Sequence, residues 1–477
     1  MTDTLGQNAE PSWDEEAEVV VIGGGLAGHC AALELAARGV EALLLEKQPE
    51  IGGSTVLSGG SFAFAGTELQ RSNGIEDSVA LLFDDLRRVG GFGNEERLVR
   101  VYVDNQLDTY HWLAEHGVVF EKVFLAAGHS VPRAHSRNPR VVLDTLAAAA
   151  QASGRVSTRT GAAVRRLVRT SSDGPVEGVV VDVEGQQRAI RALRGVILAS
   201  GGFSRNDDLL KLFAPTQAGA MRAGGPGNVG DGLRMAWRLG AGMRDMGYIK
   251  GTFGGYPGAK PGEHALMLPI YVGAIAVNAQ GERFIDESKS YKLIGDAVLQ
   301  QPDATGFQIF DQRIFERGQP DIPTMAFQAK LALGQVVSAP TLRELAARLG
   351  IDEAGLIKTV DAYNAYVEAG SDRTFGRSAL SNGYGKLERI DAPPFYGYPS
   401  KSVIVATYCG VAVDPGMRVC DVYDTPIPGL YAAGEVVGGL HGNAYMTGSS
   451  LGKAAIFGRL AARGALGVAL ERAGASA

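Results

Sequence analysis

The sequence predicts an α/β protein in which a domain built on a parallel sheet is interrupted by an inserted α+β domain. Two β-branched apolar runs, one at Val19–Ile22 and one within 195–203, lead directly into glycines, as buried parallel strands do before a tight turn. Between about 249 and 398 a Gly/Pro-rich stretch replaces this pattern, which resumes afterwards. We therefore predict one domain over 17–248 and 399–477, an inserted domain over 249–398, and a disordered tail over 1–16.

The first turn has the glycine spacing of a dinucleotide-binding loop. Gly23, Gly25 and Gly28 match G-x-G-x-x-G between the first strand and a helix predicted over 26–38. The first glycine allows the tight turn, the second lets a pyrophosphate approach the backbone, and the third lets the helix pack on the strand. Glu46 ends the second predicted strand, where a carboxylate accepts hydrogen bonds from ribose hydroxyls. The first domain is therefore predicted to be of the Rossmann type.

Composition restricts the partners and the compartment. Hydrophobic residues make up 45% of the 477 residues, as in a globular protein with a large core, and the net charge is −6 with no basic cluster, which argues against nucleic acid. Three cysteines (30, 409 and 420) without a C-x-x-C argue against disulfides and a thiolate metal site, and fit a reducing cytoplasm. Since no apolar run reaches about 18 residues, we expect no membrane span.

The remaining segments of the first domain alternate between helix and strand signals. Apolar spacing predicts helices within 77–117, and strands are predicted over 163–168 and 176–183. The 195–203 run is expected to lie beside the first strand. A glycine-rich loop over 52–60 could press its backbone against a flat ligand, the alternative being a flexible surface loop. A long final helix is predicted over 451–466.

The inserted domain shows weaker and more separated signals. A strand is predicted over 274–277 and a helix over 291–299. Two amphipathic helices are predicted within 341–369, with Asp352 as a cap. The stretch over 371–399 is expected to be irregular.

Taken together, these segments resemble the flavoproteins of the fumarate reductase and succinate dehydrogenase superfamily. The resemblance covers Glu18 to Ala462 and implies FAD bound along the parallel sheet, with a mobile cap domain that closes over the isoalloxazine. The motifs that carry it are the glycine fingerprint with Glu46, Gly52–Thr55 with Gly59 and Gly60, Ala199–Phe203, Gly230–Gly232, Gly273–Phe284, and Gly429–Glu435.

The resemblance also implies which residues contact FAD. Glu435 is expected near the ribityl chain, with the final helix pointing its N-terminus at the pyrimidine end. Asp231 is either a helix cap or a flavin-side acceptor, and His441 either bonds flavin or caps its loop. The full expected set is Gly23, Gly25, Leu26, Ala27, Gly28, Glu46, Lys47, Gly53, Ser54, Thr55, Ser58, Gly59, Gly60, Ala163, Val164, Ala199, Ser200, Gly201, Asp231, Gly434, Glu435, His441, Ser450 and Leu451.

Two motifs of the superfamily are missing from the sequence. The loop over 52–60 has no histidine, whereas membrane-bound succinate dehydrogenases attach FAD covalently through one, so FAD is expected to be non-covalent. There is no C-x-x-C-H haem site and no iron–sulfur spacing. The expected partners are a small-molecule substrate and an external electron acceptor such as a quinone, a dye or oxygen.

The positions that bind a dicarboxylate in fumarate reductases carry other residues here. By the resemblance, Tyr291 and Tyr445 stand in two arginine slots, and Ala406 stands in a histidine slot. The proton-path Glu and Arg fall on apolar positions near Met267 and Ile270. Because fixed cationic forks match carboxylates, their loss predicts a neutral substrate.

Tyrosines in both slots are what the ketosteroid dehydrogenases of this superfamily show. The run over 445–452 looks most like the 3-ketosteroid Δ4-(5α)-dehydrogenases, with Thr447 where that branch has serine; smaller cyclic ketones fit equally well. Desaturation of a ketone needs a donor at the carbonyl oxygen and a base at the α-carbon. We assign Tyr445 as donor or base support, Thr447 and Tyr291 as a proton relay, and Tyr408 as a fourth catalytic candidate.

Three other functions remain open at this point. The protein could be an ene-reductase of the fumarate or urocanate reductase type, working in the opposite direction with an external electron donor. It could be a flavin-dependent isomerase or hydratase, or a binding module without redox activity.

Two charged clusters have structural interpretations. His129, Arg133, His135 and Arg137 are expected on a surface loop, and would favour an anionic substrate if they faced the pocket. The pair 286–287 is expected to form an ion pair with the nearby Arg283 rather than to act as catalytic carboxylates.

Overall fold

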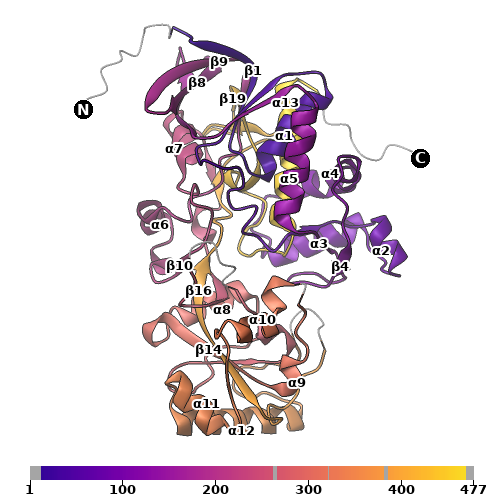
Figure 1. The fold of residues 1–477 in the computed structure, drawn as a ribbon, viewed down its shortest axis with the longest axis vertical. Helices are drawn as coiled ribbons and strands as arrows, with labels where there is room; N and C mark the ends of the chain where they lie inside the picture. Colours follow the sequence, from indigo (N-terminus) through magenta and orange to yellow (C-terminus); the bar gives the residue numbers. More distant parts are fainter. Residues whose placement is uncertain (1–11, 261–265, 321, 381–384, 469–477) are drawn as a thin grey trace. The chain divides into compact units, whose positions relative to one another are not determined.

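The computed structural model describes residues 12–260, 266–320, 322–380 and 385–468, which form two compact units (Figure 1). The first unit comprises Met1–Leu209, Gly224–Ile249 and Ala406–Ala477, and the second comprises Leu210–Ala223 and Lys250–Val405. The segment Leu210–Ala223 thus groups with the second unit, although the sequence pattern placed it in the first domain. Residues 1–11 of the expected tail lie outside the described residues, and the first strand already begins at Glu15.

The first unit is built on an eight-stranded sheet with the order β18-β19-β9-β1-β2-β6 and a β7-β8 hairpin attached to β9. The pairs β19-β9, β9-β1, β1-β2 and β2-β6 are parallel, so the run over 195–203 does lie beside the first strand. The strands are β1 (Glu15–Ile22), β2 (Ala42–Leu45), β6 (Val156–Arg159), β7 (Ala162–Arg169), β8 (Val176–Val183), β9 (Gln186–Leu198), β18 (Arg418–Cys420) and β19 (Pro426–Ala432). This parallel core confirms the predicted fold class.

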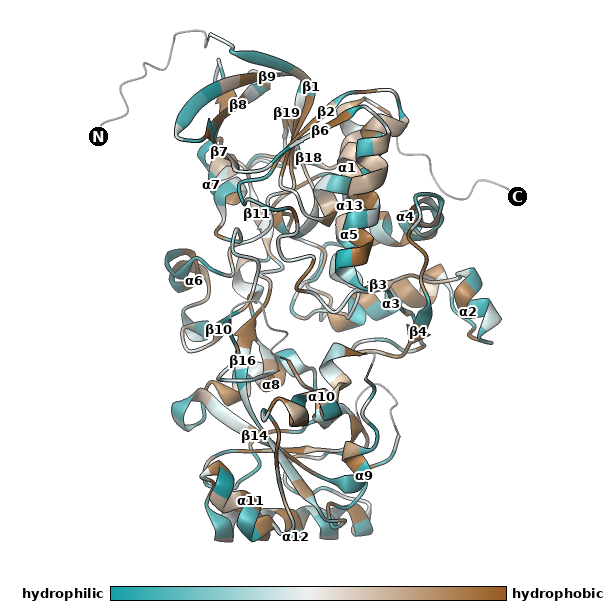
Figure 2. Ribbon diagram, in the orientation of Figure 1, coloured by the Kyte–Doolittle hydropathy of each residue, from teal (hydrophilic) through white to brown (hydrophobic). Residues whose placement is uncertain are grey.

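The helix α1 (Leu26–Ala37) is buried on every side from Leu26 to Ala36. It contacts β1, β2 and β9 on one side, and α5 (Pro139–Ala152) and α13 (Ser449–Ala465) on others. Burial on all sides explains why apolar residues are spread around the helix rather than along one stripe, with His29 and Glu34 as the buried polar exceptions. Figure 2 shows the contrast with α11 (Leu342–Leu349), which carries both brown and teal segments.

Smaller elements complete the first unit. The predicted helical stretch over 77–117 is two helices, because the glycines at 90, 91 and 93 separate them. The remaining elements are β3 (Ser61–Ala63), α2 (Glu68–Ser72), α3 (Val79–Val89), α4 (Glu96–Glu115), β4 (Lys122–Phe124), β5 (Ala134–Ser136), α7 (Asp231–Arg238), β11 (Met243–Arg244) and β17 (Gly410–Val411), and α6 (Asp207–Phe213) spans the boundary between the units.

The second unit has a six-stranded sheet with the order β10-β16-β14-β13, in which β12 and β15 also pair with β16. The long strand β16 (Phe395–Ile404) overlaps the stretch expected to be irregular, because its Gly397 and Pro399 obscure the strand pattern. The short β10 (Met221–Arg222) pairs with β16, which ties Leu210–Ala223 to this unit. The other strands are β12 (Thr252–Gly255), β13 (Ile275–Val277), β14 (Thr305–Asp311) and β15 (Val337–Ala339).

Helices pack against this second sheet. The expected helices are present as α8 (Tyr291–Val298), α11 and α12 (Glu353–Ala369), and the Asp352 carboxylate caps α12 by accepting from the Gly355 N–H at 3.5 Å. Two short helices, α9 (Gln312–Phe315) and α10 (Phe327–Ala332), were not predicted. In the described part of the chain, no helix combines the length and the apolar character needed to cross a membrane.

Candidate functional site

The glycine turn between β1 and α1 is fixed by close packing. Gly23 has φ +116 and donates its N–H to the Leu45 carbonyl at 2.8 Å, and a Cβ at this position would lie 2.3 Å from the Ala199 oxygen. A Cβ at Gly28 would lie 2.0 Å from the Gly23 oxygen. Because both approaches leave no room for a side chain, these two glycines let β1, β9 and α1 meet.

The N-terminus of α1 keeps donors available. Gly25 is the N-cap and has no side chain that could accept a hydrogen bond from the helix. The Leu26 N–H donates to the Thr55 hydroxyl at 3.0 Å, so Thr55 fixes the loop over 52–60 to the helix start. The Ala27 and Gly28 N–H groups have no partner within the helix, as in any first turn. Such an end fits a pyrophosphate.

Glu46 lies at the end of β2 and is buried. One carboxylate oxygen accepts from the Gly24 N–H at 2.7 Å, and the other accepts from the Gln48 N–H at 2.8 Å. A carboxylate has about four acceptor positions, so two remain for hydroxyl groups. The residue therefore fits a ribose.

The strand β7, which pairs with β8, begins beside the residue that follows β2. The Ala162 N–H donates to the Glu46 carbonyl at 2.8 Å, which brings Ala163 and Val164 to this end of the sheet. Lys47 forms an ion pair with Asp231, the first residue of α7. The N-cap of α7 is Gly230, so Asp231 is not the cap.

A hydrogen-bonded network joins four segments of the first unit. The Asn228 amide donates to the Ser54 hydroxyl at 3.2 Å and to the Glu435 carboxylate at 2.8 Å. The other Glu435 oxygen accepts from the Thr407 N–H at 2.9 Å. A Cβ at Gly202 would lie 2.4 Å from Glu435, so the glycine pair after β9 gives this carboxylate its space. Asn228 and Thr407 were not among the predicted site residues.

Other expected cofactor residues lie around this network. The Ser200 hydroxyl is buried and has no hydrogen-bond partner among the described residues, so it is available to a bound ligand or a water molecule. A Cβ at Gly53 or Gly59 would have no heavy atom within 4 Å. In the loop over 52–60, Gly60 packs against the Arg137 carbonyl and donates its N–H to the Ser58 hydroxyl at 3.3 Å. After β9 and β19, Gly201 lies beside Asn228 and Gly434 lies against Ala27.

Three aromatic side chains of the predicted site pack together. The Tyr408 and Tyr445 rings are stacked with centroids 4.9 Å apart, and the His441 ring meets them edge-on at 5.1 and 5.6 Å. Tyr408 has φ +59, a conformation that is costly for an aromatic residue and that tends to occur at functional sites. His441 also contacts the Ser449 hydroxyl through Nδ1 at 3.3 Å.

The Tyr445 hydroxyl lies at the N-terminus of α13. Its oxygen accepts from the Gly448 N–H at 2.9 Å. Burial raises the pKa of Tyr445 to about 12, although hydrogen bonds from the Gly448 and Ser450 N–H groups act in the opposite direction. The phenol therefore keeps its proton near neutral pH and is a hydrogen-bond donor. Ser450 and Leu451 follow in the first turn of the helix.

A buried lysine lies behind the loop that carries His441. The Lys453 ammonium donates to the Val437 carbonyl at 2.6 Å and is 1% exposed. Burial lowers the pKa of Lys453 to about 8, and the charges of Glu435 and Asp245 act against this. Asp245 in turn accepts from two N–H groups of the loop, at residues 439 and 442.

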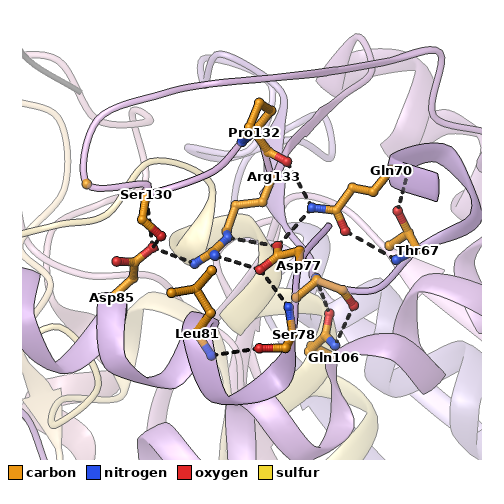
Figure 3. A network of polar contacts seen from close by, with 12 residues as sticks. Thr67, Gln70, Asp77, Ser78, Leu81, Asp85, Gln106, Ser130, Pro132 and Arg133 are labelled. Carbon is orange, nitrogen blue, oxygen red and sulfur yellow. Dashed lines mark hydrogen bonds and ion pairs between the residues drawn. The ribbon is translucent and has the colours of Figure 1, made fainter. Parts of the chain in front are cut away.

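Thr447 is attached to the cluster that was expected on the surface. Its N–H donates to the Ala127 carbonyl at 2.9 Å, and its carbonyl lies 2.7 Å from His129 Nε2. His129, Arg133 and His135 are all buried, so their placement on a surface loop was wrong. Figure 3 shows the reason: Arg133 is held by carboxylates of Asp77 and Asp85, which make burial of the cation possible.

Tyr291 belongs to the second unit. It is the first residue of α8, whose N-cap is Ser290, and its ring lies 6.1 Å from that of Tyr271. The expected ion pair between Arg283 and Glu287 is confirmed, at 2.6 Å. Arg377, which is fully buried, joins Glu287 at 3.1 Å.

The helix start at the glycine turn and the acid at the end of β2 are the features of a dinucleotide-binding protein. A family model described as "FAD binding domain" matches residues 18–451, and the chain belongs to this family and binds FAD. It is a member of the fumarate reductase and succinate dehydrogenase flavoprotein superfamily, as the motifs implied.

Named relatives include reductases and a steroid dehydrogenase. A probable fumarate reductase of Shewanella frigidimarina is 30% identical over 96% of this chain and 76% of its own length. The open conformation of a flavocytochrome c3 fumarate reductase has a TM-score of 0.81 and 30% identity, over 96% of this chain and 80% of that one. A 3-ketosteroid Δ4-(5α)-dehydrogenase from Rhodococcus jostii, solved with 4-androstene-3,17-dione, has a TM-score of 0.76 and 26% identity. The match covers 95% of this chain and 97% of that one.

Proposed function

We propose that this FAD-dependent oxidoreductase, which acts on CH–CH or C=C bonds, desaturates a neutral cyclic ketone such as a 3-ketosteroid or a smaller ring. The observation that carries the proposal is the protonated Tyr445 phenol, which accepts from the Gly448 N–H at the start of α13 and stacks on Tyr408. In fumarate reductases, by the resemblance, this slot holds an arginine. A phenol in its place binds a carbonyl oxygen without requiring a negative charge.

The same residues account for the proton chemistry. Tyr445 donates to the carbonyl oxygen and stabilises the negative charge that develops there as the α C–H loses its proton. Thr447 passes that proton on toward solvent, and Tyr408 supports Tyr445 by stacking. When bound, FAD supplies the two-electron acceptor for the hydrogen removed from the β-carbon. An external quinone, dye or oxygen then takes the electrons.

The first unit holds FAD non-covalently in this proposal. The α1 N-terminus faces the pyrophosphate, and Glu46 binds the adenosine ribose beside Ala163 and Val164. Lys47, Asp231 and the network of Ser54 and Glu435 hold the middle of the cofactor. Ser450 and Leu451 meet the flavin ring at the start of α13.

The reverse reaction is the second candidate. The similarity to a probable fumarate reductase, at 30% identity over most of both chains, supports reduction of an activated C=C bond on the same scaffold. The similarity to the Δ4-(5α)-dehydrogenase supports a ketone as the substrate in either direction.

The test is an anaerobic titration of the FAD-bound protein with ketosteroids, cyclic ketones, succinate and fumarate. We expect saturated ketones to bleach the flavin absorption. Succinate should not, because losing a bidentate charge-assisted contact costs about 2–5 kcal/mol and two such slots are changed. Reoxidation of dithionite-reduced enzyme by enones alone would favour the ene-reductase, and efficient turnover of fumarate or succinate would contradict the neutral substrate.

A further inference from the structure

Both backbone groups of Thr447 are held by the segment over 126–129. The Thr447 N–H donates to the Ala127 carbonyl at 2.9 Å, and the Thr447 carbonyl lies 2.7 Å from His129 Nε2. Because a carbonyl oxygen only accepts, His129 Nε2 carries the proton and donates. These two bonds restrain the φ and ψ of Thr447 and hence the position of its Cβ, from which the hydroxyl extends.

The segment that holds Thr447 is itself firmly anchored (Figure 3). The Arg133 guanidinium, which is fully buried, donates to Asp77 at 2.7 and 3.0 Å and to Asp85 at 2.8 Å. Ser130 donates its N–H and its hydroxyl to the same Asp85 oxygen at 2.8 and 2.7 Å. The Gln70 amide donates to the Pro132 carbonyl at 2.8 Å. His129 is therefore attached to α3 through short and charge-assisted bonds.

Among the described residues, the ring nitrogens of His129 make one contact, the bond to the Thr447 carbonyl. The side chain is 3% exposed, and Nδ1 has no hydrogen-bond partner among the described residues. A buried acceptor without a partner is unfavourable, so histidine is retained here at the cost of one unpaired nitrogen, and its bond to the Thr447 carbonyl offsets that cost. His135, six residues later in β5, differs. Its Nε2 contacts the Thr67 hydroxyl at 2.7 Å, and its Nδ1 contacts the Arg133 carbonyl at 2.9 Å.

We propose that His129 is a positioning residue for the reaction, which holds the backbone of Thr447 in place, and with it the base of the Thr447 side chain, by donating from Nε2 to the Thr447 carbonyl. The proposal rests on the proposed function, in which Thr447 relays a proton. The neutral ring is the form that buries without a counter-charge, since desolvation and the nearby Arg133 cation lower the pKa of His129 to about 3. The contact thus stays the same across the pH range in which the protein is handled.

Three variants of the FAD-bound protein test this. His129→Leu removes the donor, His129→Gln keeps an N–H near the Nε2 position, and His135→Leu removes a buried histidine that does not contact Thr447. Two measurements are made: hydrogen exchange at the Thr447 amide by mass spectrometry, and steady-state turnover of a ketone with an artificial electron acceptor, which gives kcat and KM. Thermal unfolding and FAD content serve as controls for folding.

We expect His129→Leu to speed exchange at Thr447 by about tenfold or more, because the local bonds open more readily. It should lower kcat by about 10- to 100-fold with little change in KM, the effect of a misplaced catalytic group. His129→Gln should recover most of both. His135→Leu should lower the melting temperature more than His129→Leu, since both of its ring nitrogens have partners, and should leave Thr447 exchange and kcat unchanged.

Several results would overturn the proposal. They are wild-type exchange and kcat in His129→Leu, no recovery in His129→Gln, or an equal effect of His135→Leu on Thr447, which would indicate general loosening. If no ketone bleaches the wild-type flavin, the proposed function fails. The attachment of Thr447 is then judged on the exchange rates, and faster exchange in His129→Leu alone still supports it.

Discussion

The Tyr445 phenol combines two features of a catalytic donor: it keeps its proton, and its oxygen is fixed by a backbone N–H. Thr447, two residues later, has both backbone groups bonded to the 126–129 segment. The Tyr445 oxygen and the Thr447 backbone are therefore both held by hydrogen bonds. In the proposed function, this is the preorganisation that we expect to stabilise a developing oxyanion.

Removing the Tyr445 hydroxyl tests this. Tyr445→Phe should keep FAD and the fold, because the ring still stacks on Tyr408. Flavin reduction by a ketone should fall by about 10²- to 10³-fold, the usual loss for an oxyanion donor or general acid. The measurement is stopped-flow flavin bleaching, with Tyr423→Phe as a control, since Tyr423 is 85% exposed. Equal rates for both variants would show that the phenol takes no part.

The lowered pKa of Lys453 predicts that the stability of the folded protein depends on pH. Its pKa in the folded protein is lowered to about 8 from a usual value of 10.5, so the unfolded chain binds more protons between these two pH values. Stability from this group should therefore rise with pH through that window, by roughly 3 kcal/mol in total. Below about pH 8 the cost of the buried charge is fully present.

Lys453→Met should remove this rise. Urea unfolding at pH 7 and at pH 10 should show a smaller gain in the variant than in the wild-type protein. Lys211→Met, at an exposed position, controls for the loss of one positive charge. An unchanged pH dependence in Lys453→Met would mean that the ammonium is not penalised by burial.

At the level of elements, the contact between β1, β9 and α1 depends on two glycines. A Cβ at Gly28 would lie 2.0 Å from the Gly23 oxygen, a backbone atom that cannot move without shifting the turn. The N-terminus of α1, which in the proposed function faces the FAD pyrophosphate, would shift with it. We therefore expect the packing of α1 and the binding of FAD to be coupled through this position.

Gly28→Ala should lower the free energy of unfolding by about 1–3 kcal/mol through overpacking and should lower the FAD content of the purified protein. Gly247→Ala is the matched control, because a Cβ there has no heavy atom within 4 Å. For both variants, urea unfolding gives the free energy of unfolding, and the ratio of absorbance at 450 and 280 nm gives the FAD content. Full FAD content in Gly28→Ala would contradict the coupling.

At the scale of the whole molecule, the cofactor should be released by denaturation. The loop over 52–60 contains no histidine, the residue that carries covalent FAD in the membrane-bound relatives of the superfamily. Acid precipitation should therefore leave yellow FAD in the supernatant, identified by chromatography and by its fluorescence. Flavin that stays in the protein pellet would contradict non-covalent binding.

The sequence predicted the parts of the fold that depend on local patterns. The glycine turn, the strands around it and the final helix each show their signal within a few residues. The network around Asn228 does not, because its partners Ser54 and Glu435 are 174 and 207 residues away in the chain. The burial of Arg133 likewise depends on carboxylates 48 and 56 residues earlier, which no local pattern reveals.

The chain order of the first unit has a consequence for synthesis. The strand β19 and the helix α13, which complete the sheet beside β9 and cover α1, are translated only after Lys250–Val405. The edge of β9 and one side of α1 thus remain uncovered during translation of the second unit, which proceeds at about 5–20 residues per second. We expect the nascent protein to need protection of that apolar surface until its last helix arrives.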